Sequence, residues 1–252
     1  MRLKGKTAIV TGGGAGIGEA IALAFGREGA RVVIADRDAS RGEAVAGAVQ
    51  RMGGDSLFGL CDVGSTDSVT EMVATTVSRL GKPEILVNNP AIQLIGQDSR
   101  VHDVSENAWD RTMNVNLKGT WRCMRSVIPH MLGQGGSIVN IASPTGMLGV
   151  APGYSAYSSS KGGVFGLSRV AAAEYARDGI RVNAVVPGTT ITPLIEDMLN
   201  DDATRRSLEA KSPMGRLGTP ADVAGIAVFL ASDEASYCTG GVYMADGGMT
   251  AV

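Results

Sequence analysis

The chain has 252 residues, enough for one large hydrophobic core, and its 44% hydrophobic and 19% charged residues are ordinary for a globular protein. Its net charge of −2, with Lys and Arg spread along the sequence, argues against nucleic acid as the main ligand, because a phosphate backbone calls for a basic face. No apolar run approaches the roughly 20 residues of a membrane span, and the N-terminus lacks the features of a signal peptide, so we expect a cytoplasmic protein without a membrane partner.

Potential metal ligands are few and scattered. The three cysteines, Cys61, Cys123 and Cys238, lie far apart and fit neither a disulfide framework nor a zinc site. Only two histidines occur, His102 and His130. We therefore expect no metal site and no Ser-His-Asp triad.

Short apolar runs alternate with longer helical patterns along the chain, which is typical of βαβ units and a parallel sheet. The first predicted strand, residues 7–10, runs into a glycine-rich turn and then into an apolar pattern of helical period. This order puts a pyrophosphate at a helix N-terminus, and glycines there permit positive φ and close approach of the backbone. The spacing of Gly12, Gly16 and Gly18 therefore predicts a dinucleotide site.

The second predicted strand, residues 31–35, ends at Asp36. A carboxylate at this point can accept hydrogen bonds from both hydroxyls of the adenosine ribose and would repel a 2′-phosphate. Arg37 follows and can in principle pair with that phosphate, but Ala15 stands where an NADP site often has a second basic residue. We expect NAD rather than NADP, and the alternative for Asp36 is a solvated acid in a turn.

Polar residues also follow the next two predicted strands. After residues 56–60, Asp62 is placed to meet the adenine edge or to cap the turn before a helix whose N-cap is Ser65. After residues 84–87, Asn88 and Asn89 can brace the sheet and the cofactor or serve only as turn residues.

Four further polar residues, from residue 116 onward, are candidates for the site. A long helical pattern over residues 108–130 contains Asn116, which we expect to be either a structural bridge or part of a site. The strand over residues 136–142 presents Ser143 at its end, where ligands of doubly wound sheets bind. Tyr157 and Lys161 share one face of the following helix, and an ammonium beside a phenol favours the phenolate, which lowers the tyrosine pKa.

These residues together resemble the classical short-chain dehydrogenase/reductase family over nearly the whole chain. The likeness rests on motif order and spacing: the glycine turn, Asp62-Val63, Asn88-Asn89, Asn116 in Val-Asn-Leu-x-Gly, Ser143, Tyr157-x-x-x-Lys161, Pro187-Gly188 and Asp246-Gly247-Gly248. The resemblance implies a single domain, residues 1–252, with a Rossmann-type doubly wound parallel sheet of seven strands flanked by helices. It also implies a homotetramer.

The resemblance further implies the roles of individual residues. Tyr157 would be the acid/base, Ser143 would hydrogen-bond the reacting oxygen, Lys161 would bind the nicotinamide ribose and lower the tyrosine pKa, and Asn116 would position a water. The cofactor would contact the glycine turn, the strand ends and the loop after the sixth strand: Gly12, Gly14, Ala15, Gly16, Ile17, Gly18, Asp36, Arg37, Asp62, Val63, Asn89, Pro90, Ala91, Tyr157, Lys161, Pro187, Gly188, Thr190 and Thr192. The chain departs from the family pattern at Pro90-Ala91 and at Pro144, which puts the shape of the pocket in question.

The segment 189–217 is the longest insertion between predicted core elements, and its centre, residues 194–210, has the pattern of an amphipathic helix. In this family such a segment covers the substrate, although a simple surface hairpin is the alternative. Candidate substrate contacts are mostly apolar: Gln93, Leu94, Ile95, Ser143, Pro144, Met147, Leu148, Tyr154 and Tyr157. They favour a neutral secondary alcohol or its ketone that is cyclic, hydroxylated or sugar-like, while Arg205, Arg206, Lys211 and Arg216 leave acidic substrates open.

Two other functions compete with an NAD-dependent alcohol dehydrogenase. One is a 3-oxoacyl-carrier-protein reductase that uses NADPH, and Asp36 with Ala15 argues against it. The other is a non-catalytic dinucleotide-binding sensor or scaffold, which would have no reason to keep the full set Asn116, Ser143, Tyr157 and Lys161.

Overall fold

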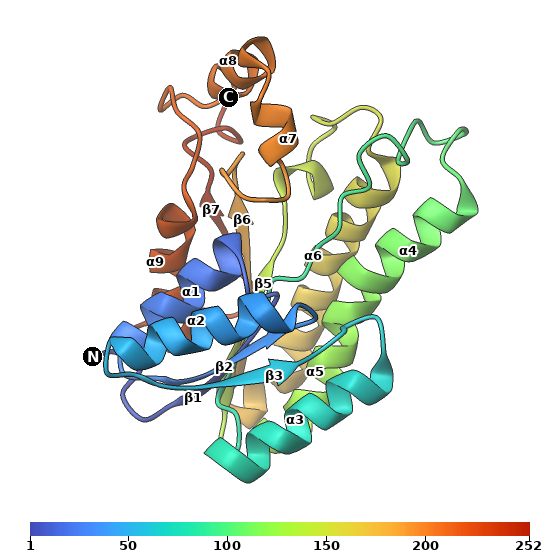
Figure 1. The fold of residues 1–252 in the computed structure, drawn as a ribbon. Coiled ribbons are helices and arrows are strands. Elements are labelled where there is room, and N and C mark those ends of the chain that lie inside the picture. Colours follow the sequence, from blue (N-terminus) through green and yellow to red (C-terminus); the bar gives the residue numbers. More distant parts are fainter.

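One parallel sheet of seven strands runs through the computed structural model, which describes residues 1–252, in the order β3-β2-β1-β4-β5-β6-β7 (Figure 1). The strands are β1 (Thr7–Thr11), β2 (Arg31–Asp36), β3 (Asp55–Leu60), β4 (Ile85–Asn88), β5 (Gly136–Ile141), β6 (Ile180–Pro187) and β7 (Val242–Ala245). Every neighbouring pair is parallel. The order reverses between β1 and β4, so the predicted doubly wound Rossmann-type sheet is confirmed.

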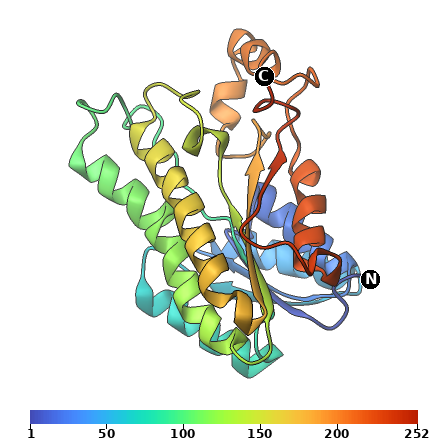
Figure 2. The same ribbon diagram turned by 180° about the vertical axis from the view of Figure 1, so that it is seen from behind.

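Helices cover both faces of the sheet (Figures 1 and 2). One layer is formed by α1 (Gly16–Arg27), α2 (Ala39–Arg51) and α9 (Pro220–Ala231), and the other by α3 (Thr66–Leu80), α4 (Glu106–Asn116), α5 (Lys118–Met131) and α6 (Ser155–Tyr175). Two short helices, α7 (Glu196–Leu199) and α8 (Asp202–Glu209), stand above the carboxyl ends of the strands. None of the helices combines the length and the apolar character that crossing a membrane requires.

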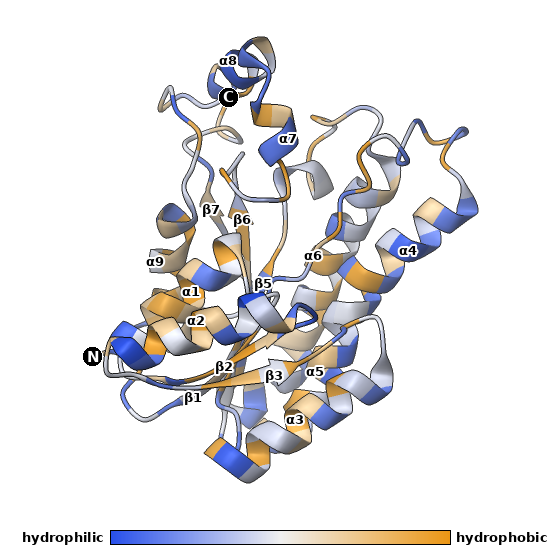
Figure 3. Ribbon diagram, viewed as in Figure 1, coloured by the Kyte–Doolittle hydropathy of each residue, from blue (hydrophilic) through white to orange (hydrophobic).

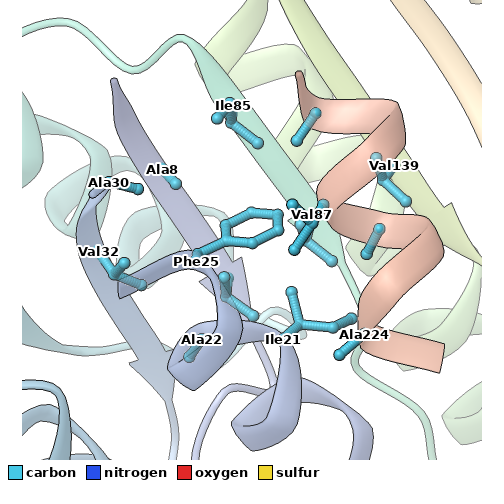
Figure 4. Close-up of a cluster of buried hydrophobic side chains, with 14 of the residues drawn as sticks. Ala8, Ile21, Ala22, Phe25, Ala30, Val32, Ile85, Val87, Val139 and Ala224 are labelled. Atoms are coloured by element: carbon cyan, nitrogen blue, oxygen red, sulfur yellow. The ribbon is translucent and has the colours of Figure 1, made fainter. Parts of the chain in front are cut away.

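The central strands are buried on both faces, which explains why they are continuous runs of Val, Ile and Leu (Figure 3). Figure 4 shows one of the two large cores, where Phe25 and Ile21 of α1 pack against Ile85 and Val87 of β4 and against Ala224 of α9. The packed sheet gives the turns at its carboxyl edge a fixed base.

Two predicted helices are interrupted in the structure. The helix expected over residues 108–130 is α4 followed by α5, with a break at Leu117. Leu117 has φ of −100° and ψ of −57° there, and the Thr120 hydroxyl donates a 2.8 Å hydrogen bond to the Asn116 carbonyl beside it. The helix expected over residues 194–210 is split into α7 and α8, because Asp201 is extended and its side chain caps α8 by accepting from the Thr204 N–H.

Candidate active site

The glycine turn between β1 and α1 lies at the switch point of the sheet. Gly12 and Gly16 have φ of +62° and +58°, a region that favours glycine. A Cβ on Gly18 would lie 2.0 Å from the Gly12 carbonyl oxygen, so α1 can begin this close to β1 only because residue 18 has no side chain. Asn89 at the end of β4 donates to the same carbonyl at 3.0 Å and braces the turn. The backbone of the turn is therefore held in a shape that leaves room for a pyrophosphate.

Asp36 is oriented by two backbone N–H groups. Its Oδ2 accepts from Gly14 at 2.9 Å and its Oδ1 accepts from Asp38 at 3.0 Å, which fixes the carboxylate beside the glycine turn. Arg37 and Arg41 line the same end of the cavity. The carboxylate can accept from a ribose diol. The Arg41 guanidinium is paired with Asp38 at 3.4 Å.

Ser143, Tyr157 and Lys161 meet at the other end. Ser143 lies two residues after the end of β5 and is buried, and the Lys161 ammonium donates a 2.9 Å hydrogen bond to the carbonyl of Ile141, the last residue of β5. The Lys161 nitrogen lies 5.9 Å from the centre of the Tyr157 ring. The three side chains therefore place a phenol, a hydroxyl and an ammonium on one wall.

The pKa values of this group differ in direction from the expectation for Tyr157. Burial raises the pKa of the Tyr157 phenol, and the Ser143 hydroxyl beside it opposes the rise only in part. Burial also lowers the pKa of Lys161 to about 8. Because the protein environment disfavours both charged forms, desolvation outweighs the stabilisation of the phenolate that the Tyr-Lys spacing alone suggests.

Asn116 is completely buried and does not line the cavity. Its amide joins three segments: Oδ1 accepts from the Ile92 N–H at 2.8 Å, and Nδ2 donates to the Ile92 carbonyl at 3.0 Å and to the Ser160 hydroxyl at 3.1 Å. The side chain therefore links the loop after β4 to helix α6.

One cavity of about 680 Å³ joins the two ends of the site. Most predicted cofactor and substrate residues line it, namely Gly12, Ala15, Gly16, Ile17, Asp36, Arg37, Asp62, Val63, Asn89, Pro90, Ala91, Gln93, Ser143, Pro144, Tyr154, Tyr157, Lys161, Pro187, Gly188, Thr190 and Thr192. The glycine turn and the loop after β6 approach each other here, since a Cβ on Gly16 would lie 3.2 Å from Thr192 Cγ2. The donors, the carboxylate and the glycine turn fit a dinucleotide lying along the strand ends.

Six other predicted residues lie outside the cavity wall: Gly14, Gly18, Leu94, Ile95, Met147 and Leu148. Gly14 and Gly18 affect the shape of the turn without lining the cavity. The Gly14 N–H donates a hydrogen bond to Asp36, and Gly18 lies in close contact with Gly12. Leu94, Ile95, Met147 and Leu148 were predicted to touch substrate, but none of the four lines the cavity, and Met147 is 44% exposed. All four lie in loops without periodic structure, where the direction of a side chain cannot be predicted from spacing.

The cavity also has walls that the sequence pattern did not reveal. Val150, Ala151 and Pro152 come from the loop before α6, and Met249 comes from the C-terminal segment. The segment around α7 and α8 contributes Leu194, Ile195, Met198, Leu208 and Lys211, in keeping with its predicted position over the substrate. No group of three or more His, Cys, Asp or Glu side chains is arranged to hold a metal ion.

Comparisons with known proteins show oxidoreductases that are similar to the chain over nearly its whole length. The family model described as enoyl-(acyl carrier protein) reductase matches residues 12–250. The chain is 42% identical over 253 residues to 2,5-dichloro-2,5-cyclohexadiene-1,4-diol dehydrogenase of Sphingobium indicum, with 99% of both proteins covered. It is 38% identical over 250 residues to the 3-oxoacyl-[acyl-carrier-protein] reductase FabG of Thermotoga maritima, again with 99% of both covered. A crystal structure from Burkholderia xenovorans, described as a short-chain dehydrogenase/reductase, has a TM-score of 0.94 at 38% identity and covers 100% of this chain and 98% of that one.

Proposed function

Because the chain belongs to the short-chain dehydrogenase/reductase family, we propose that it interconverts a secondary alcohol and its ketone with NAD(H), using Tyr157 as acid/base. The observation that carries the proposal is the cavity itself. Ser143, Tyr157 and Lys161 line it together with the glycine turn and Asp36. A proton donor and a dinucleotide site therefore open into one space.

Each of the three side chains has a distinct task. The nicotinamide, when bound, supplies the hydride acceptor or donor. Tyr157 removes the hydroxyl proton of the alcohol or returns it to the ketone oxygen, while Ser143 donates a hydrogen bond to that oxygen. Lys161 carries a buried positive charge that stabilises the Tyr157 phenolate when the phenol has given up its proton. Asn116 hydrogen-bonds to Ile92 and Ser160. Its role is therefore to fix the loop after β4 relative to helix α6, which carries Tyr157 and Lys161.

The choice of NAD is supported by Asp36, whose two carboxylate oxygens are already oriented toward the glycine turn by Gly14 and Asp38. The alternative is a 3-oxoacyl-carrier-protein reductase using NADPH. Arg37 and Arg41 beside Asp36 favour that alternative, as does the similarity to the Thermotoga reductase. We favour NAD because a carboxylate at the end of the second strand would repel a 2′-phosphate.

The substrate that we propose is a neutral cyclic or hydroxylated secondary alcohol. The cavity wall around the substrate end is largely apolar, with Val150, Leu194, Ile195, Met198 and Leu208. A relative of 42% identity is named as a dehydrogenase of a cyclic diol. We also propose a homotetramer, supported by the exposed Trp121 of α5 and Val170 of α6, and a cytoplasmic location, supported by three free cysteines.

Substitution of Tyr157 by Phe tests the proposal. It removes the hydroxyl alone, so turnover is expected to fall about 10²- to 10⁴-fold while NADH binding and the fold are retained. Tyr175→Phe is the matched control, because Tyr175 lies at the other end of α6 and outside the cavity. Turnover near the wild-type rate in Tyr157→Phe would exclude the tyrosine as the proton donor, and binding without turnover in the wild type would favour a non-catalytic sensor.

A further inference from the structure

The first turn of α6, which carries Tyr157, is capped by a loop far away in the sequence. The residue before the helix, Tyr154, makes no side-chain cap. Instead the Asp98 carboxylate accepts from Ala156 at 3.1 Å through Oδ1 and from Tyr157 at 2.9 Å through Oδ2. The Ser99 carbonyl accepts from the Ser155 N–H at 3.3 Å. Three N–H groups that a helix start leaves without partners are thus all satisfied by two consecutive residues of the loop between β4 and α4 (Figure 1).

The Asp98 carboxylate is unusual in its surroundings. It is 7% exposed and takes part in none of the ion pairs of the chain. The carboxylate accepts hydrogen bonds only from backbone N–H groups, those of Ser99, Ala156 and Tyr157. A buried carboxylate without a cation is costly unless its oxygens are fully hydrogen-bonded and a helix N-terminus faces it, and both conditions hold here.

The loop that carries Asp98 is attached to the site at two points. Its start is held where Asn116 binds both backbone groups of Ile92, and its far end is held where Asp98 binds α6. Between these points, Gln93 lines the cavity. Asn116 also bonds Ser160, one turn beyond Tyr157, so both attachments tie the loop to α6 around the tyrosine. The substrate wall and the tyrosine therefore share one hydrogen-bonded frame.

We propose that Asp98 is a positioning residue for Tyr157. The carboxylate accepts a hydrogen bond from the backbone N–H of Tyr157 and so fixes the position of the first turn of α6. The position of that turn in turn sets the direction in which the phenol points toward Ser143. This inference rests on the proposed function, in which Tyr157 moves the proton. Only a carboxylate at this position can accept from three N–H groups at once, since an amide has a single acceptor oxygen.

The proposal predicts that substitution of Asp98 lowers turnover but leaves NADH binding nearly unchanged. Asp98→Ala is expected to lower kcat about 10- to 100-fold, because a shift of the order of 1 Å in a reacting group has that effect. Asp98→Asn keeps one acceptor oxygen and is expected to recover part of the loss. The Kd for NADH is expected to change less than about twofold in both variants, since Asp98 does not line the cavity.

Ser105→Ala is the matched control, because Ser105 caps α4 by accepting from the Ala108 N–H at 3.2 Å and lies outside the cavity. It is expected to lower the Tm without changing kcat. If Asp98→Ala lowers the Tm in the same way and keeps kcat within about twofold of wild type, Asp98 is only a stabilising cap and the proposal is wrong. Should Asp98→Ala fail to fold, the near-isosteric Asp98→Asn decides by the same criteria.

Hydrogen exchange gives a result that does not depend on turnover. Asp98→Asn is expected to speed exchange of residues 155–158 and to leave α9 unchanged, and unaltered exchange at the start of α6 would overturn the proposal whatever the activity. Full activity of Tyr157→Phe would instead overturn the proposed function and leave the capping of α6 intact. The two failures are therefore distinguishable.

Discussion

At the scale of single residues, burial decides the chemistry of the Tyr157-Lys161 pair. The spacing of the two residues predicts that they share a helix face, and the structure places the Lys161 nitrogen 5.9 Å from the Tyr157 ring. The direction of the tyrosine pKa shift could not be predicted from spacing, because it depends on how deeply the phenol is buried. Asp98 could not be predicted either, since it lies 59 residues before Tyr157 in a loop without a motif.

Lys161 gives the protein a characteristic dependence of stability on pH. Its pKa falls from 10.5 to about 8 on folding because of burial. Below pH 8 the ammonium is charged in both states, and the folded state bears the cost of burying it, about 3 kcal/mol at 1.36 kcal/mol per pKa unit. As pH rises toward 10.5, the unfolded state releases its proton as well and this cost disappears.

Lys161→Met tests whether burial of the ammonium destabilises the protein below pH 8. The variant has no charge to bury, so it is expected to be more stable than wild type by the largest margin near pH 7. This difference in the free energy of unfolding is expected to fall steadily between about pH 8 and pH 10. The Ile141 carbonyl loses its donor in the variant at every pH, which shifts the difference by a constant. Urea denaturation at several pH values measures it, and a difference that stays flat or grows with pH would contradict a lowered Lys161 pKa.

At the scale of elements, the glycine turn was the part of the site most fully predictable from the sequence. Strand, glycines and helix follow one another within a few residues, so the local pattern suffices. The interruption of the two predicted helices was not predictable, because a hydrophobic period reports neither the backbone angles at Leu117 nor the side-chain cap formed by Asp201. α8 has no buried residue and is mostly hydrophilic (Figure 3), which explains why the period there was a poor guide.

Gly18→Ala tests the account of the turn. The added methyl would meet the Gly12 carbonyl at 2.0 Å and the Asn89 amide at 2.7 Å, so the turn must open. The Kd for NADH is expected to rise at least about tenfold while the circular dichroism stays that of a folded protein, because a displaced turn loses the close approach of its N–H groups.

Gly225→Ala is the control for that substitution. Gly225 is an exposed glycine within α9 and has no atom within 4 Å of the position of a Cβ. Alanine there is expected to raise stability by about 0.5 to 1 kcal/mol and to leave NADH binding alone. Equal NADH affinity in Gly18→Ala and wild type, measured by fluorescence titration, would show that the turn does not bind the cofactor.

At the scale of the whole molecule, the parallel sheet turns scattered residues into one site. Gly12, Asp36, Asn89, Ser143 and Pro187 lie at or just beyond the carboxyl ends of five different strands, and all reach the same cavity because parallel strands end at one edge. That convergence could be predicted from the alternation of strands and helices. The segment around α7 and α8 was predicted to lie over the substrate and does line the cavity, but the walls formed by the loop before α6 and by Met249 could not be predicted, because their positions depend on tertiary packing.

The central claim is tested most directly by measuring kcat/KM of the purified protein with NAD⁺ and with NADP⁺ across cyclic diols, polyols and 3-hydroxyacyl thioesters. The account predicts turnover of a cyclic or hydroxylated alcohol and a preference for NAD⁺ of about 10- to 100-fold, the effect of hydrogen bonds from a ribose diol to the Asp36 carboxylate. Preference for NADP⁺ with turnover of the acyl thioester alone would contradict it and would assign the chain to the carrier-protein reductases.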